Sequence, residues 1–150
     1  MIQLKGIARR SAKRAAMEEL PACDITTHEG VAGDFRGKPG KRQVTVLSEE
    51  AWQMASGQID VELPWTARRA NLLISGFIFD ESCLGKIIQI GDVRLEITKE
   101  TVPCFRMDEA HEGMQEALKS DWRGGVCCRV LQSGHVSLGD GIEVSDVVPE

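Results

Sequence analysis

The sequence lacks the features of several large protein classes. Its apolar runs fall well short of the ~18 residues that a membrane-spanning helix needs, so we predict no membrane segment. Its 15 glycines and five prolines are too few for a collagen-like or low-complexity chain. No apolar secretory segment follows the basic start, which predicts a reducing, cytoplasmic location. A length of 150 residues suits one compact domain over residues 1–150.

Motifs for zinc, nucleotides and serine hydrolysis are also missing. The five cysteines are an odd number, with no C-x-x-C pair and no histidine at zinc spacing. We therefore expect free thiols and no zinc. The G-K-[ST], G-x-G-x-x-G and G-x-S-x-G patterns are absent as well. The question becomes which thiol, if any, takes part in chemistry.

Basic residues are outnumbered but unevenly placed. The net charge of −5 comes from 23 acidic and 18 basic residues, which argues against a nucleic-acid partner. Several basic residues nevertheless precede the first acidic one, Glu18: Lys5, Arg9, Arg10, Lys13 and Arg14. Such a start also occurs in transit peptides, but the alternation of apolar and polar residues over 2–7 favours a first strand.

Most of the chain reads as short strands separated by glycine-containing turns. A Gly91-Asp92 pair predicts a two-residue hairpin loop, and residues 132–134 predict a second hairpin. The pattern favours a mostly β protein with a few helices (α+β), closed into a barrel or packed as a sandwich. The segments that read as strands are 2–7, 43–46, 71–79, 86–90, 93–97, 126–131, 135–138 and 142–144.

Two segments have the pattern of helices. Ser48 is placed to cap a helix that ends near Gly57, with two glutamates in its first turn. Asp108 is placed to cap a second one. Apolar residues recur there at helical spacing and predict a buried face rather than a cofactor contact: Met107, Ala110, Met114 and Leu118.

Cys104 has the local setting that best suits a reactive thiol. It follows Pro103, which stiffens the backbone, at a junction between a predicted strand and a predicted helix. Arg106 and the positive end of that helix both favour a thiolate. The alternative is a small buried packing residue, the commonest fate of a free cysteine. Cys127 and Cys128 are adjacent in a strand, point to opposite faces and are expected to pack.

Three segments contain candidate ligand-binding residues. Arg68, Arg69 and Asn71 precede an apolar run, where two guanidinium groups and an amide can clamp phosphate or carboxylate. The alternative there is a solvated strand end with ordinary ion pairs. Arg129 lies in a short apolar run and needs a partner, either a ligand or a buried carboxylate. The glycine-rich segment 29–40 is either a site loop or a surface connection.

These short motifs occur in a characteristic order along the chain. They are Glu29-Gly30-x-x-Gly33-Asp34, Arg42 to Ser48, Arg69-x-Asn71-Leu72, Leu84-Gly85 with Ile90-Gly91, Pro103-Cys104, and Arg129-Val130-Leu131-x-x-Gly134 with Gly139-Asp140. The ordered set resembles the MOSC domain, named for the C-terminal domain of molybdenum cofactor sulfurases. The resemblance extends over nearly the whole chain. It implies a β-barrel-like fold with helices outside.

The resemblance also assigns roles to individual residues. It implies that Cys104 is the family's characteristic cysteine, which carries sulfur as a persulfide or contacts the molybdenum of a bound molybdopterin-type cofactor. Cys104 is therefore the candidate catalytic residue and, where molybdenum is bound, the metal ligand. The candidate cofactor-binding residues are Arg68, Arg69, Asn71, Arg129 and Asp34.

The expected function follows from this resemblance. The 150 residues include no counterpart of the pyridoxal-phosphate domain of sulfurases or of the N-terminal β-barrel of larger molybdenum reductases. We therefore expect a stand-alone protein that binds such a cofactor, or carries sulfur on Cys104 to a metal-sulfur or molybdenum centre. Its partner would be a sulfur donor such as a cysteine desulfurase, or an electron-donor protein.

Two alternatives stay open for the function. One is a molybdenum-dependent reductase of N-hydroxylated compounds, and the other is a non-catalytic module that binds an anionic small molecule or a partner. An exposed apolar strand face would also allow an oligomer.

Overall fold

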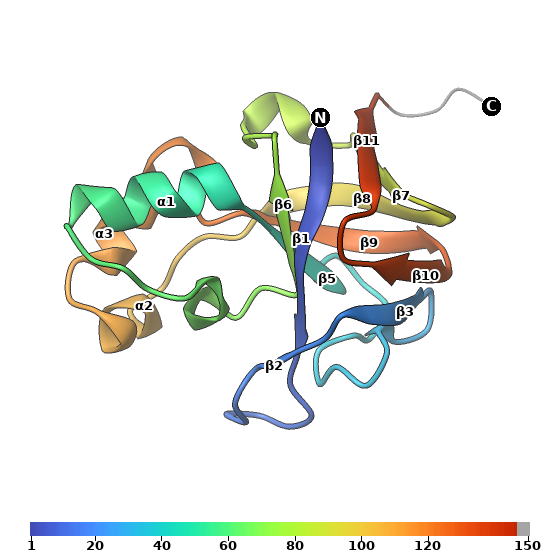
Figure 1. Ribbon diagram of the computed structural model, residues 1–150, viewed down its shortest axis with the longest axis horizontal. Helices are drawn as coiled ribbons and strands as arrows, with labels where there is room; N and C mark the ends of the chain where they lie inside the picture. The colour runs from blue at the N-terminus through green and yellow to red at the C-terminus, as the bar shows by residue number, and fades with distance from the viewer. Residues whose placement is uncertain (147–150) are drawn as a thin grey trace.

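A closed β-barrel forms the body of the protein (Figure 1). The computed structural model describes residues 1–146. The barrel strands pair in the order β11-β7-β8-β9-β5-β6-β1, and pairing of β1 with β11 closes the ring. Only β5 and β6 run parallel within this ring; the other described pairs are antiparallel. The strands are β1 (Ile2–Arg9), β5 (Val44–Ser48), β6 (Leu72–Ser75), β7 (Ile87–Ile90), β8 (Val93–Glu100), β9 (Val126–Gln132) and β11 (Gly141–Ser145).

A smaller sheet and a short hairpin extend the barrel. β2 (Glu18–Glu19) pairs with the end of β1. The small sheet has the order β10-β3-β4, with β3 at Ala22–Thr26, β4 at Gly30–Val31 and β10 at Gly134–Ser137. The strand-rich fold, the strand predicted over 2–7 and the hairpin at Gly91-Asp92 are confirmed.

The hairpin predicted around residues 132–134 is wrong. β9 pairs with β5 on one edge and with β8 on the other, so the ring leaves it no free edge. The chain therefore leaves the barrel after β9, and β10 pairs antiparallel with β3. Gly134 lies at this crossing, where an added Cβ would come within 3.0–3.1 Å of Asp92 and Val93. Local turn chemistry shows where the chain turns, but the strand with which the next strand pairs depends on which sheet edges the closed ring leaves free.

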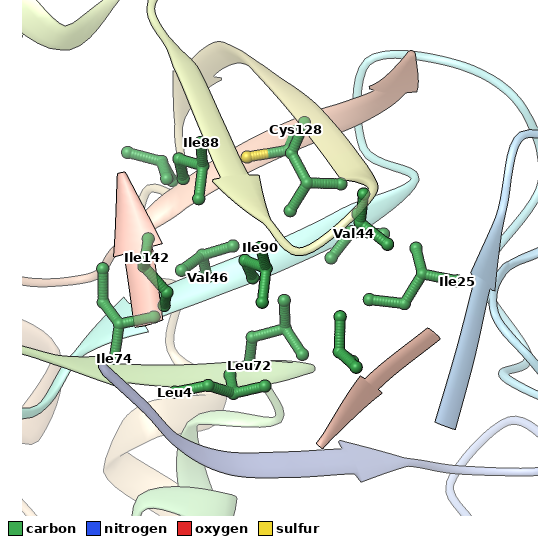
Figure 2. Close-up of a cluster of buried hydrophobic side chains, with 14 of the residues drawn as sticks. Leu4, Ile25, Val44, Val46, Leu72, Ile74, Ile88, Ile90, Cys128 and Ile142 are labelled. Atoms are coloured by element: carbon green, nitrogen blue, oxygen red, sulfur yellow. The ribbon is translucent and has the colours of Figure 1, made fainter. Parts of the chain in front are cut away.

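Alternating side chains fill the inside of the barrel (Figure 2). Val44 and Val46 of β5, Ile88 and Ile90 of β7, and Cys128 of β9 are among them, and all are buried. This period-two burial is what the sequence pattern predicts for strands with one face inward. Burial of this interior supplies most of the apolar driving force for closing the barrel.

The two adjacent cysteines both pack, on opposite faces of β9. Cys128 points into the barrel core. Cys127 is equally buried but lies outside the barrel, where its Sγ is 3.2 Å from the Thr101 hydroxyl. The two side chains thus point to opposite faces of β9, as predicted, and both are packing residues.

The helices gather on one side of the barrel (Figure 1). They are α1 (Glu49–Gln58), α2 (Arg106–Ala110) and α3 (Met114–Lys119), with the 3-10 turns η1 (Trp65–Arg68) and η3 (Ser120–Trp122). A further 3-10 turn, η2 (Glu81–Cys83), lies apart from them, between β6 and β7 in the chain. Ser48 caps α1 as predicted, since its hydroxyl accepts the N–H of Ala51 at 3.2 Å. Within residues 1–146, every helix is too short or too polar to cross a lipid bilayer.

The second predicted helix is two helices. α2 begins at Arg106 instead of Asp108, and the chain breaks before α3 at Gly113, whose φ is +92°. The Asp108 carboxylate accepts the N–H of Gln115 at 2.9 Å, so it caps the first turn of α3 rather than its own helix. Three residues of the predicted apolar stripe, Met107, Met114 and Leu118, are buried, whereas Ala110 is exposed, so the prediction of a buried face is wrong for Ala110. The second core consists of Leu47, Trp52, Ala55, Ala70, Leu73, Met107, Met114, Ala117 and Leu118.

Two glycines are expected to respond in opposite ways to alanine. A Cβ on Gly37 would overlap the backbone carbonyl oxygen of Glu29, so Gly37→Ala forces the loop to move and lowers the free energy of unfolding by about 1–3 kcal/mol. Gly57 lies in α1 with open space around it, so Gly57→Ala raises that free energy by about 0.5–1 kcal/mol. Urea unfolding measures both. Equal effects of the same sign would contradict the close packing at Gly37.

Candidate functional site

A cavity of about 190 Å³ lies beside the barrel, between segments far apart in the sequence. It is lined from the end of β1, the glycine-rich loop, β5, η1 and the stretch between β8 and α2. Its lining contains Asp34 and Cys104, and six arginines: Arg10, Arg36, Arg42, Arg68, Arg69 and Arg106. The fold thus gathers a third of the chain's 18 basic residues around one cavity.

None of these six arginines is neutralised within residues 1–146. The ion pairs in that part of the chain involve other cations, and no carboxylate oxygen lies within 4.0 Å of a cavity guanidinium. Burial lowers the pKa of Arg10, and the neighbouring Arg69 and Arg36 lower it further, while the Asp34 carboxylate opposes this shift only in part. Such mutual repulsion is relieved by a bound anion, and an arginine fork matches phosphate or carboxylate in a bidentate way.

Arg68 is the most firmly held of the six. Its Nε donates to the carbonyl of Gly124 at 3.0 Å, and one Nη donates to the carbonyl of Thr101 at 2.8 Å. Burial is the main cause of a lowered pKa, which a negative charge on Cys104 would oppose. Carbonyl groups orient the guanidinium but carry no charge, so its positive charge stays available to an anion.

Two further arginines lie against aromatic rings. The Cζ of Arg10 lies 6.0 Å from the ring centroid of Phe35, and that of Arg106 lies 5.5 Å from Phe105. These cation–π distances are within the favourable range, so the rings limit where the guanidinium groups can lie.

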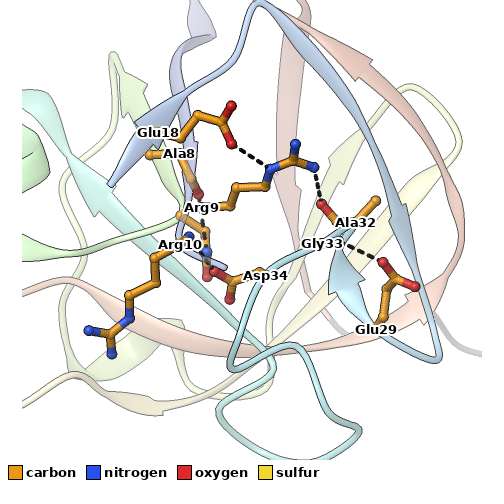
Figure 3. Close-up of polar contacts among 9 residues, drawn as sticks. Ala8, Arg9, Arg10, Glu18, Glu29, Ala32, Gly33 and Asp34 are labelled. Carbon is orange, nitrogen blue, oxygen red and sulfur yellow. Dashed lines mark hydrogen bonds and ion pairs between the residues drawn. The ribbon is translucent and has the colours of Figure 1, made fainter. Parts of the chain in front are cut away.

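Asp34 shapes the loop instead of pairing with an arginine side chain. One carboxylate oxygen accepts the backbone N–H of Arg10 at 3.1 Å, and the other accepts that of Arg36 at 3.3 Å. Figure 3 shows the Arg10 side chain extending away from this carboxylate. Asp34 therefore joins the glycine-rich loop to the end of β1 and places two arginine backbones at the cavity.

The rest of the loop is tied down by charged groups (Figure 3). Arg9 donates to the Glu18 carboxylate at 3.0 Å and to the carbonyl of Ala32 at 2.6 Å. Glu29 accepts the N–H of Gly33 at 2.6 Å. The segment predicted as either a site loop or a surface connection thus forms a fixed wall of the cavity.

Asn71 lines the cavity, but its side-chain amide is hydrogen-bonded to the backbone of β1 and β5. Its Oδ1 accepts the N–H of Thr45 at 3.0 Å, and its Nδ2 donates to the carbonyl of Ala8 at 3.2 Å. The side chain is buried and joins β1 to β5 at the start of β6. The hydrogen bonds of Asn71 therefore hold barrel strands together.

Cys104 is the exposed thiol of the chain, and it lies on the cavity wall. The other cysteines are buried: Cys23, Cys83, Cys127 and Cys128. Burial raises the pKa of Cys23 to about 11 and raises that of Cys128 as well. A buried packing role, the alternative for Cys104, does not fit its exposed position.

Arg129 lies apart from the other candidates. It is on the exposed face of β9 and lines no part of the cavity; its guanidinium is 3.9 Å from the Glu96 carboxylate. Of the residues predicted to bind a cofactor, the fold brings together Arg68, Arg69, Asn71 and Asp34 with Cys104, but not Arg129.

Sequence reasoning missed four of the cavity arginines as site residues: Arg10, Arg36, Arg42 and Arg106. No spacing connects them, because they come from separate segments. The available signals were weak: an excess of basic residues before Glu18, Arg42 inside one of the ordered motifs, and Arg106 two residues after Cys104.

Comparison with known proteins identifies the fold and the family. The family model for the MOSC domain matches residues 26–143. The YUAD protein of Bacillus subtilis superposes with a TM-score of 0.82 at 20% identity, covering 97% of both chains. YiiM of Geobacillus stearothermophilus gives 0.79 at 16% identity over 97% of this chain and 76% of that one, and YiiM of Escherichia coli gives 0.73 at 14% over 99% and 72%. No curated protein sequence matches. The family match covers most of the chain, which therefore belongs to the MOSC domain family.

Proposed function

We propose that this protein binds an anionic, molybdopterin-type cofactor with one end in the arginine-lined cavity, and that it uses the Cys104 thiol as its reactive group. The observation that carries the proposal is the set of six arginines without a carboxylate partner in residues 1–146, around the wall that holds the exposed thiol. Membership of the MOSC family, which is generally linked to the molybdenum cofactor, supports this choice of anion.

The residues of the cavity fit such a group. Within residues 1–146, no cluster of three or more His, Cys, Asp or Glu side chains is placed to hold a bare metal ion. The donor set is instead guanidinium groups with one thiol, which suits a phosphate-bearing cofactor that brings its own metal ligands. When bound, a molybdopterin-type group would supply a redox-active molybdenum centre, with Cys104 as the protein's thiolate ligand.

Sulfur carrying needs a single exchange at Cys104. The Cys104 thiolate attacks the outer sulfur of a donor persulfide, R–S–SH. A new S–S bond forms at Sγ, the donor's S–S bond breaks, and the donor leaves as the thiolate R–S⁻. The Cys104 sulfur is oxidised as the departing donor sulfur is reduced, so no external oxidant is needed. The exposed position of Cys104 gives a protein donor access to it.

The decisive experiment is intact mass and metal content of protein made in a host that makes the molybdenum cofactor. We expect either a reductant-labile gain of one sulfur atom or molybdenum with pterin, and loss of that gain or metal in Cys104→Ser. Arg42→Gln removes a cavity charge and should reduce pterin content. Arg129→Gln changes an exposed β9 residue that does not line the cavity; it is the matched arginine control and should leave both sulfur and pterin content unchanged.

Each outcome decides between functions. Labile sulfur without metal supports a persulfide carrier. Molybdenum lost in Cys104→Ser supports the reductase of N-hydroxylated compounds, because that activity needs the metal. If the Cys104→Ser protein keeps the full sulfur and metal content, or if wild-type protein carries neither, the proposed role of the thiol is wrong and an anion-binding module is left.

A further inference from the structure

A second hollow of about 540 Å³ continues the cavity outward. The two share lining residues, among them Arg10, Arg36, Arg69 and Arg106, so these arginines form the wall between an inner and an outer compartment. Cys104 lines the inner compartment only. The outer one adds Lys13 and Arg14 from the turn between β1 and β2, with Glu109 as its acidic residue.

The size of the inner cavity limits what it can hold. Sites for small molecules and cofactors usually span about 300–1,000 Å³. At about 190 Å³, the inner cavity accommodates an anionic end group, but not a whole cofactor. A ligand whose end group reaches Cys104 must therefore place its remaining length in the outer hollow.

The outer hollow is also held in a strained, defined shape. Arg14 and Arg69 both have positive φ values, +65° and +62°, which are costly for residues other than glycine. The Arg69 guanidinium donates to the carbonyl of Ala15 at 3.1 Å and thereby joins the β1–β2 turn to η1. The Trp65 indole makes a second link to the same hairpin by donating to Glu19 at 3.1 Å. Two strained arginine backbones at one hollow indicate that the turn is positioned, not free.

The outer hollow, like the inner cavity, is lined by an excess of positive charge. Within residues 1–146 neither Lys13 nor Arg14 has a carboxylate oxygen within 4.0 Å. With the four shared arginines, six cations surround the outer hollow against one glutamate, in a chain whose net charge is −5. A neutral or cationic extension of the ligand would not relieve this repulsion, whereas a second anionic group would.

We propose that the outer hollow is a second anion subsite and that the ligand is an elongated molecule with two anionic groups. One group lies in the inner cavity beside Cys104, and the other lies at Lys13 and Arg14. The inference rests on the proposed anion-binding function and adds the ligand's length, polarity and second charge.

Calorimetric titration with inorganic phosphate and with tripolyphosphate, at one ionic strength, tests the two subsites separately. The double variant Lys13→Gln/Arg14→Gln is expected to weaken tripolyphosphate binding about tenfold or more, the effect of losing charge-assisted hydrogen bonds, and to change phosphate binding less than about twofold. Arg42→Gln should weaken the binding of both ligands, because each places an anionic group in the inner cavity and Arg42 lines that cavity only.

A charge-matched control separates a local subsite from a general effect of net charge. Lys99→Gln/Arg129→Gln removes the same two charges from exposed positions on β8 and β9 that line neither compartment, so it should leave both affinities within about twofold of wild type. If the outer double variant weakens both ligands equally, or neither, the second subsite is wrong while the inner cavity stands. If phosphate does not bind, or binds Arg42→Gln with the same affinity as wild type, the proposed anion site itself is wrong.

Discussion

Cys104→Ser is expected to remove the fast-reacting thiol of the native protein and to slow total alkylation by at least about 100-fold. All five cysteines lie in the described part of the chain, and Cys104 is the exposed one. Burial raises the pKa of Cys23 to about 11, so at pH 7.5 only roughly one part in three thousand of that thiol is ionised. Since the thiolate is the nucleophile, burial protects all four remaining cysteines, and the raised pKa adds to this protection at Cys23 and Cys128.

Iodoacetamide labelling followed by intact mass and peptide mapping gives the measurement. Wild-type protein should take up one equivalent quickly, on the peptide that contains Cys104, and the other four only after denaturation. Cys23→Ser is the matched control, because it removes a buried thiol and should leave the fast phase intact. A fast phase that persists in Cys104→Ser would show that another cysteine is accessible, and it would remove the basis for assigning sulfur chemistry to Cys104.

Cys104 was predictable because its signal is local. A proline before it and an arginine two residues after it are visible in any short window, as is its place between a strand and a helix. The barrel strands are predictable for the same reason: alternation in β8, where Val93, Leu95 and Ile97 are buried, is a period-two pattern. What local patterns cannot give is the partner of a strand, as the crossing from β9 to β10 shows.

The arginine cavity was beyond local reasoning for a related reason. Arg42 and Arg106 are 64 positions apart and lie on one cavity only because the barrel closes and the helices pack against it. Arg129 shows the same dependence on the fold: its sequence left either a ligand or a carboxylate as its partner, and the pairing of β8 with β9 places Glu96 beside it. Residue type indicates which chemistry is possible, and the nonlocal fold decides which residues share a site.

Asn71→Ala is expected to lower the free energy of unfolding by about 2–4 kcal/mol and to leave phosphate affinity within about twofold of wild type. The resemblance to the MOSC family points to Asn71 as a cofactor-binding residue, whereas its amide is bonded to the Thr45 N–H and the Ala8 carbonyl. Alanine leaves the buried Ala8 carbonyl and the half-buried Thr45 N–H without their side-chain partner, and each such loss costs about 1–3 kcal/mol. Urea unfolding and phosphate titration of the folded variant measure the two effects separately.

Asn71→Asp sharpens this test, because it keeps the acceptor for the Thr45 N–H and replaces the donor to the Ala8 carbonyl. Protonated, the new carboxyl can still donate to that carbonyl; ionised, it becomes a buried charge facing a carbonyl oxygen. We expect burial and the facing carbonyl to raise its pKa in the folded protein above the unfolded value of about 3.9 by more than the cavity arginines lower it, so the stability relative to wild type is greatest below that pH and falls as pH rises. The stability gap to wild type should widen steadily from pH 4 to pH 7. A gap that does not change with pH, together with a loss of phosphate affinity in Asn71→Ala, would show that the amide serves the ligand and not the barrel.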